Sequence, residues 1–223
     1  MENPFVSNVI MMIGPVPISF EVVVTWGIMV VLCLVAWLSC RNFRMYPGRW
    51  QTAIELLVVG IDGQITEITG DKKRHFLPLI GTLFIFIAIA NLVDLIPGLS
   101  APTAVLETPA ALAVIIFFSV HYVGICSQGF WQYLKSYAKP NLLLMPFTIL
   151  SQITRTFSMM IRLFGNIMSG QFLIGLLLAF AGLLVPIPLM VLHVLISLIQ
   201  AYIFATLATV FIAAAMADET RGD

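Results

Sequence analysis

The sequence has 223 residues, of which 60% are hydrophobic and only 10% are charged. Because soluble domains carry about 25% charged residues, this composition excludes an ordinary soluble domain and indicates a membrane protein. The formal net charge is zero, so bulk charge gives no indication of a partner. The sequence contains no nucleotide-binding loop, hydrolase motif or metal-ligand spacing. We therefore expect a non-catalytic membrane protein that uses no cofactor and binds no nucleic acid.

Five apolar stretches are long enough to cross a bilayer as helices, which takes about 20 residues for about 30 Å of hydrocarbon. The sequence therefore predicts an all-α polytopic membrane protein, organised as a single membrane domain over residues 1–223. The predicted membrane-crossing helices are 20–39, 76–96, 109–127, 141–181 and 188–217.

Two segments between these helices have the character of a membrane surface. Residues 40–74 contain six Lys and Arg residues, and the part 50–61 is amphipathic, as in a helix that lies in the interface. Residues 128–140 combine aromatic side chains with two lysines, which is typical of an interfacial belt. We predict that 40–74 is a cytoplasmic or interfacial segment.

The basic residues also predict the orientation of the chain. Nine of the eleven Lys and Arg residues lie in 40–74, in 128–140 or after 217, and the other two are Arg155 and Arg162. Basic residues collect in cytoplasmic loops, so the N-terminus is predicted outside and the C-terminus in the cytoplasm. This orientation requires an odd number of crossings, and five fits. We expect a multi-pass protein of the bacterial plasma (inner) membrane.

The stretch 141–181 is too long for an upright helix. At 1.5 Å per residue it would be about 60 Å long, twice the hydrocarbon thickness. It is therefore either two helices or one steeply tilted helix. Two helices would add a crossing and contradict the charge pattern, so we predict a strongly tilted helix followed by a second long one, 188–217.

Arg162 is the most informative residue of the sequence. From residue 140 to 217 there are 78 residues with only two charges, Arg155 and Arg162. Arginine stays protonated in proteins, and burying its charge at a bilayer centre costs roughly 2.5 to more than 10 kcal/mol. Such a residue indicates an ion path or an anionic partner. Arg155 fits the same interpretation, or alternatively extends its charge to the interface.

A polar stripe runs along the same predicted helix. Its residues recur at spacings of three, four or seven and so share one side of the helix. Packing through small residues explains Ser, Gly and Thr, but it does not explain two arginines. The stripe consists of Thr148, Ser151, Arg155, Ser158, Arg162, Gly165, Asn166 and Ser169.

The last predicted helix has a second stripe, formed by His193, Ser197 and Gln200. Gln200 is predicted to hydrogen-bond Arg162 without neutralising it. His193 can relay protons, because an imidazole titrates near neutral pH, or it is a packing residue; the sequence leaves both interpretations open.

Two acidic residues map to the predicted outer side. Asp94 ends the helix 76–96, and Glu107 lies at the end of the loop that follows. Either residue could line an access route for ions. Alternatively Asp94 caps a helix end, and Glu107 interacts with the positive end of a helix dipole.

Several sequence blocks, in order across 47–217, resemble subunit a of the F-type rotary ATP synthase. The most specific block is 161–166, Ile-Arg-Leu-Phe-Gly-Asn, followed by Ser169-Gly170. Further support comes from 198–202, Leu-Ile-Gln-Ala-Tyr, from 91–97, Asn-Leu-Val-Asp-Leu-Ile-Pro, and from 47–51, Pro-Gly-Arg-Trp-Gln, with Glu55.

The resemblance implies a non-catalytic stator subunit beside a rotating ring of c subunits, each carrying a carboxylate in mid-membrane. It implies two aqueous half-channels for H+ or Na+, two long tilted helices against the ring, b subunits of the peripheral stalk as partners, and an indirect link to the F1 sector. The family's essential arginine corresponds to Arg162 and its helix-partner glutamine to Gln200. The candidate ion-translocation residues are Arg162, Gln200, His193, Asn166, Gln171, Ser158, Asp94 and Glu107.

This sequence departs from the proton-channel pattern of many relatives. Those relatives carry a glutamate and a histidine in the outer half-channel, whereas here Gln171 and His193 occupy the two places. Val105 and Thr148 stand where some relatives have further acidic residues. The resemblance therefore leaves the choice between H+ and Na+ open, including a sodium-coupled bacterial sub-branch.

Two other classes of function fit the sequence less well than a stator subunit does. A self-contained secondary transporter or channel commonly shows inverted repeats, and no such repeat is found in this sequence. A membrane-embedded enzyme would need facing clusters of His, Asp or Glu, which the sequence pattern does not provide.

Overall fold

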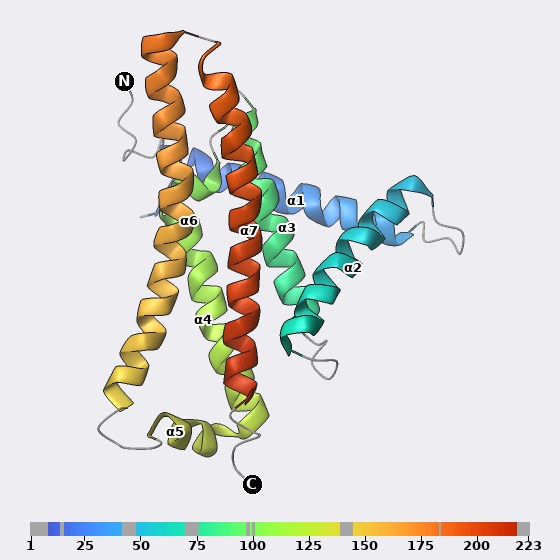
Figure 1. The fold of residues 1–223 in the computed structure, drawn as a ribbon, viewed down its shortest axis with the longest axis vertical. Helices are drawn as coiled ribbons and strands as arrows, with labels where there is room; N and C mark the ends of the chain where they lie inside the picture. The colour runs from blue at the N-terminus through green and yellow to red at the C-terminus, as the bar shows by residue number, and fades with distance from the viewer. Residues whose placement is uncertain are drawn as a thin grey trace.

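The computed structural model describes residues 9–13, 16–41, 48–69, 76–96, 99, 101–138, 145–182 and 184–217. Within these residues the chain is mainly helical (Figure 1). Its elements in chain order are β1 Val9–Ile13, β2 Val16–Ser19, α1 Phe20–Arg41, α2 Arg49–Thr69, α3 Leu77–Leu92, the 3-10 turns η2 Val93–Leu95 and η3 Pro102–Ala104, α4 Glu107–Gln128, α5 Phe130–Ala138, α6 Met145–Ala181 and α7 Pro186–Ala217.

Five of the described helices are long and apolar enough to cross a membrane, which confirms the predicted polytopic all-α membrane fold. Their apolar spans are Phe20–Ser39, Leu77–Leu95, Glu107–Ser127, Met145–Phe180 and Pro186–Met216. The third and fifth predicted helices begin slightly earlier than predicted: α4 begins two residues before 109 and α7 two residues before 188. Residues 141–144 of the predicted fourth helix lie outside the described residues.

The long fourth stretch is one continuous helix and not two. α6 has 37 residues and is therefore about 55 Å long, and α7 has 32 residues and is about 48 Å long. The two run side by side through the molecule (Figure 1). This confirms the predicted pair of long helices.

Glycine and proline define where these helices end and begin. Gly129 (φ 81°) and Gly182 (φ 77°) follow α4 and α6 in the left-handed region, which glycine adopts without steric cost. The Gly129 N–H also donates to the Ile125 carbonyl at 2.8 Å, closing the last turn of α4. α7 starts at Pro186, a position where the missing N–H would have no helical partner anyway.

The core lies where α3, α4, α6 and α7 meet, with Ile65 of α2 packed against it. α3 and α7 approach closely through small buried residues, Ala88 on α3 and Ala201, Ala205 and Ala208 on α7. Small side chains allow helix backbones to come close inside a membrane. This close approach positions the polar groups described below.

The remaining elements lie around this core. The β1–β2 hairpin was not predicted; Pro17 of β2 pairs with Met12 of β1, which a two-stranded edge tolerates. α1 crosses the direction of α6 and α7 at a steep angle, and most of its surface is exposed (Figure 1). The predicted amphipathic segment 50–61 lies within α2, which continues to Thr69.

α5 occupies part of the predicted interfacial belt 128–140 and folds back against α4. The ring of Tyr133 fills the space where a side chain on Gly124 would lie, so this glycine allows the contact. Trp131 on the same short helix is exposed. α5 therefore presents an aromatic surface at the end of the molecule opposite to the α6–α7 turn (Figure 1).

Candidate functional site

Arg162 lies on the outer surface of the isolated chain. Met159, Leu163 and Ile167 form the buried face of the same part of α6. Arg162 is exposed, roughly a quarter turn around the helix from this face, as are Arg155 and Ser158 of the predicted polar stripe. Within the described residues, the Arg162 guanidinium makes no hydrogen bond and no ion pair. A permanent charge on an apolar helix is thus available to a group outside this chain.

Arg155 lies two helical turns before Arg162 and contacts α7. Its Cζ is 5.3 Å from the centre of the Phe211 ring, in the geometry of a cation–π contact. An open cavity of about 430 Å³ lies along this part of α6. Its lining residues are Phe147, Leu150, Ser151, Thr154, Arg155 and Ser158. Part of the polar stripe therefore lines a hollow on the surface of the first half of α6.

Gln200 does not bond Arg162 in this structure. Gln200 is buried on α7, whereas Arg162 is exposed on α6, and no hydrogen bond joins them among the described residues. The predicted contact therefore remains a prediction for the assembled state. Its absence from the isolated chain has a simple physical reason, because an exposed guanidinium can extend to solvent when no partner surface covers it.

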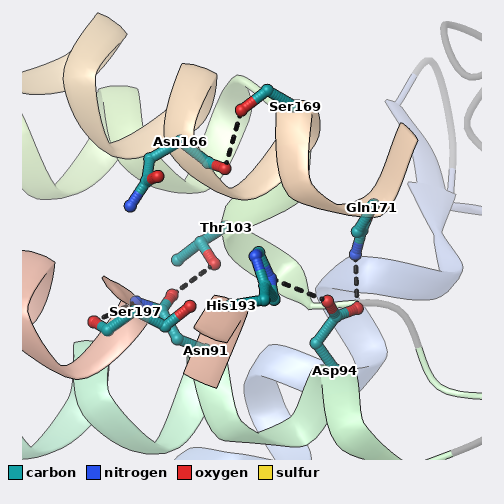
Figure 2. A network of polar contacts seen from close by, with 8 residues as sticks. All are labelled: Asn91, Asp94, Thr103, Asn166, Ser169, Gln171, His193 and Ser197. Carbon is teal, nitrogen blue, oxygen red and sulfur yellow. Dashed lines mark hydrogen bonds and ion pairs between the residues drawn. The ribbon is translucent and has the colours of Figure 1, made fainter. Parts of the chain in front are cut away.

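Asp94, Gln171 and His193 meet at a second, buried site (Figure 2). Gln171 Nε2 of α6 donates a hydrogen bond to Asp94 Oδ1 of η2. The other carboxylate oxygen, Asp94 Oδ2, lies 3.3 Å from His193 Nε2 of α7. The side chains of His193 and Asp94 are 7% and 11% exposed. The structure therefore brings together three predicted site residues from three separate segments.

The imidazole of His193 is held by packing more than by a directed hydrogen bond. A Cβ at Gly170 would overlap the imidazole ring, so the missing side chain of this glycine makes room for it. His193 Nε2 has no directed hydrogen bond among the described residues, although it is close to the carboxylate. The contact with Asp94 is thus a close approach of the two groups without the geometry of a hydrogen bond. A carboxylate and an imidazole can each exchange a proton, and carboxylate and carboxamide oxygens also suit small hard cations.

A hydrogen-bonded chain lies directly beside this group (Figure 2). Thr103 Oγ1 of η3 donates to Asn91 Oδ1 of α3 at 2.7 Å. Asn91 Nδ2 in turn donates to the Ser197 backbone carbonyl of α7 at 3.2 Å. The sequence alone predicted no role for Asn91 or Thr103. A signal for Asn91 was available, since it precedes Asp94 by three residues and so shares its helix face.

Asn166 and Glu107 lie apart from these contacts. The Asn166 backbone carbonyl accepts a hydrogen bond from Ser169 Oγ at 3.0 Å, while its Nδ2 is buried without a partner among the described residues. Glu107 is exposed in the first turn of α4, where its charge suits the helix dipole. Asp94 does not act as a helix cap here. Its side chain accepts the hydrogen bond from Gln171, and no side-chain hydrogen bond caps η2.

Comparison with known proteins identifies the family of this chain. The family described as ATP synthase A chain matches residues 22–213. The chain is 52% identical over 221 residues to ATP synthase subunit a 2 of Bradyrhizobium sp. (strain BTAi1), covering 99% of both chains. It is 46% identical over 204 residues to ATP synthase subunit a 2 of Pelobacter propionicus, covering 92% of this chain and 90% of the relative.

A third relative extends the same result. ATP synthase subunit a 1 of Hahella chejuensis is 44% identical over 209 residues, which cover 94% of this chain and 89% of the relative. The matches extend over almost the whole chain and include all the helices that carry the polar sites. The chain therefore belongs to the ATP synthase A chain family, subunit a of the F-type ATP synthase.

Proposed function

We propose that this chain is the stator ion-channel subunit of the Fo sector, which couples H+ or Na+ movement to rotation of the c-ring. The observation that carries the proposal is Arg162, a permanent cation exposed on an apolar helix without a partner among the described residues. The group that complements it is a carboxylate in the middle of each c subunit. The b subunits of the peripheral stalk hold the chain in place, and F1 is reached indirectly through them.

The guanidinium works by changing the charge of the passing ring carboxylate. A carboxylate loaded with an ion is neutral and can face lipid. Opposite Arg162 the nearby positive charge favours the ionised form, so the ion is released into one half-channel. The empty carboxylate passes the arginine and reloads from the other half-channel. The same fixed cation repels ions that would leak directly between the two channels.

The two polar sites suit the two half-channels. Asp94, Gln171 and His193 lie near the end that the charge pattern predicts to be outside, and they form the access route from that side. The hollow beside Arg155 and Ser158 lies nearer the predicted cytoplasmic end and forms the inner route. This assignment follows from an outside N-terminus and a cytoplasmic C-terminus in the bacterial plasma membrane.

The chemistry of the outer site accommodates either ion. The Asp94–His193 contact suits proton exchange, while oxygen atoms of Asp94 and Gln171 suit Na+. ATP hydrolysis by the intact complex, measured with and without Na+ across pH, decides between them. A rate that requires Na+ at neutral pH assigns sodium, and a rate indifferent to Na+ at every pH assigns protons.

The decisive variant is Arg162→Ala. We expect the complex to assemble and ATP-driven ion pumping to be abolished, because nothing then forces the ring carboxylate to release its ion. The measurement is ion uptake into vesicles that contain the complex. Leu163→Ile, a change on the buried face of the same helix, is the matched control and should retain pumping. Coupled pumping that persists in Arg162→Ala would refute the role of the arginine.

A further inference from the structure

We infer that Asn91 and Thr103 are positioning residues that hold Asp94 against His193 and thereby set the affinity of the outer ion route. The inference rests on the proposed function, because it concerns the access side of that route. The hydrogen-bonded chain from Thr103 through Asn91 to the Ser197 carbonyl is called the Asn91 latch below. It joins the η3 turn and α3 to α7 (Figure 2).

Burial makes the latch specific. Asn91, Thr103 and Ser197 are 2%, 0% and 1% exposed. Buried polar groups require their hydrogen bonds, because an unsatisfied group loses its hydration without compensation. The Thr103 hydroxyl occupies Asn91 Oδ1, which leaves the Asn91 amide N–H to point at α7. The Ser197 carbonyl can receive this bond, since a carbonyl oxygen has two lone pairs.

The latch and the Asp94–His193 contact are two neighbouring links to α7, one from α3 and one from the adjoining η2. Asn91 and Asp94 are three residues apart, and His193 and Ser197 are four residues apart. Residues at these spacings lie on one side of a helix, about one turn from each other. The first link therefore fixes the position of the second.

The second link cannot fix its own geometry. The 3.3 Å contact between His193 Nε2 and Asp94 Oδ2 has no directed hydrogen bond. The surrounding contact of α3 with α7 is made mainly through apolar and small residues, which form no directed bonds. A buried hydrogen bond to one particular carbonyl specifies one register. Gln171 also holds the Asp94 carboxylate, but it does so from α6. The Asn91 latch is the described hydrogen bond that joins α3 to α7.

The test compares the two sides of the membrane in the assembled complex. In vesicles with F1 facing the medium, ATP synthesis loads ions from the lumen, which is the outer side. ATP-driven pumping loads ions from the medium, which is the cytoplasmic side. For each direction the rate is measured against Na+ concentration at fixed pH and against pH at fixed Na+. The half-saturating concentration of whichever ion drives the parent complex is then the readout.

Thr103→Val removes the hydroxyl donor with little change in shape. We expect it to raise the outer-side half-saturating concentration about two- to tenfold, the effect of one hydrogen bond, and to leave the cytoplasmic-side value unchanged. Asn91→Leu should act in the same direction, and Thr103→Ser, which keeps the hydroxyl, should restore the parent value. Thr82→Val is the matched control, since the exposed Thr82 hydroxyl bonds only its own helix.

The outcomes separate this inference from the proposed function. If Asp94→Asn raises the outer-side value but Thr103→Val does not, the inference is wrong and the outer route stands. If neither variant changes the value, the outer route itself is wrong. A loss that affects both sides equally and follows the amount of assembled complex assigns a purely structural role and overturns the inference. Should Asn91→Leu fail to assemble, Thr103→Val decides.

Discussion

Single residues determine what each polar site can do. Arg162 is an exposed cation, while Gln200 is a buried carboxamide on the facing helix. A guanidinium cannot be replaced by a lysine without loss, because lysine deprotonates more readily when desolvated and lacks the planar fork. A carboxamide that only orients this group is less critical than the charge itself.

Gln200→Leu tests that ranking. We expect it to reduce coupled ion pumping less than Arg162→Ala does, because the cation remains and loses only an orienting neighbour. Pumping per assembled complex is measured for both variants in the same vesicles. An equal or greater loss in Gln200→Leu would show that the glutamine, and not the arginine, is the more important residue.

Gly170→Ala tests the fit of His193. The added Cβ would overlap the imidazole, which must move away from Asp94. Forcing extra volume into a packed site costs about 1–3 kcal/mol, so we expect ATP-driven transport per complex to fall about tenfold. Gly175→Ala on the same helix is the control, since no atom lies within 4 Å of its added Cβ. Equal activity of the two variants would contradict the assigned packing.

At the scale of elements, helix length decides orientation. The span of α1 has 20 residues, about 30 Å, and crosses the hydrocarbon only when nearly upright. α6 and α7 run at a steep angle to α1 (Figure 1). We therefore expect them to be strongly inclined in the same bilayer, with their whole apolar length in lipid or against protein.

Site-directed labelling along α6 checks this inclination. An upright α6 would leave roughly eight residues at each end in water, because it is about 25 Å longer than the hydrocarbon is thick. We expect spin labels at the exposed positions Ile149, Phe157 and Phe180 to be equally protected from a water-soluble relaxation agent. Strong relaxation at Ile149 and Phe180, with protection only at Phe157, would indicate an upright helix.

The elements themselves were largely predictable, but their contacts were not. Apolar runs and the spacing of Arg155 and Arg162 are local signals, so the long α6 and its polar stripe followed from the sequence. The Asp94–Gln171 bond joins residues 77 positions apart, a separation that no periodicity encodes. The hairpin was missed because its prolines indicate an interruption of structure. An edge position, which only pairing reveals, tolerates them.

At the scale of the whole molecule, the two ends differ in their elements and in their basic residues. The α6–α7 turn lies at one end of the molecule and α5 at the other (Figure 1). Lys135 lies on α5, Arg155 lies in the half of α6 that begins near α5, and the sequence has no Lys or Arg in the turn. The positive-inside rule then predicts that α5 faces the cytoplasm.

Cysteine labelling tests this orientation. Leu184 in the turn is 80% exposed and Trp131 on α5 is 75% exposed, so the two positions are matched in accessibility. In a variant without Cys33, Cys40 and Cys126, an impermeant thiol reagent should label Leu184→Cys in intact cells and Trp131→Cys only in inverted vesicles. The reverse pattern would invert the proposed topology and exchange the two half-channels.

The buried η3 turn has a practical consequence for protein engineering. Short loops between helices normally accept inserted tags, because they lie on the surface. Here Ala101 and Thr103 are completely enclosed, and the turn contacts α1, α3, α4 and α6. An epitope placed between residues 101 and 104 would therefore disrupt the centre of the bundle, whereas the exposed α6–α7 turn offers a safer position for a fluorophore or affinity tag.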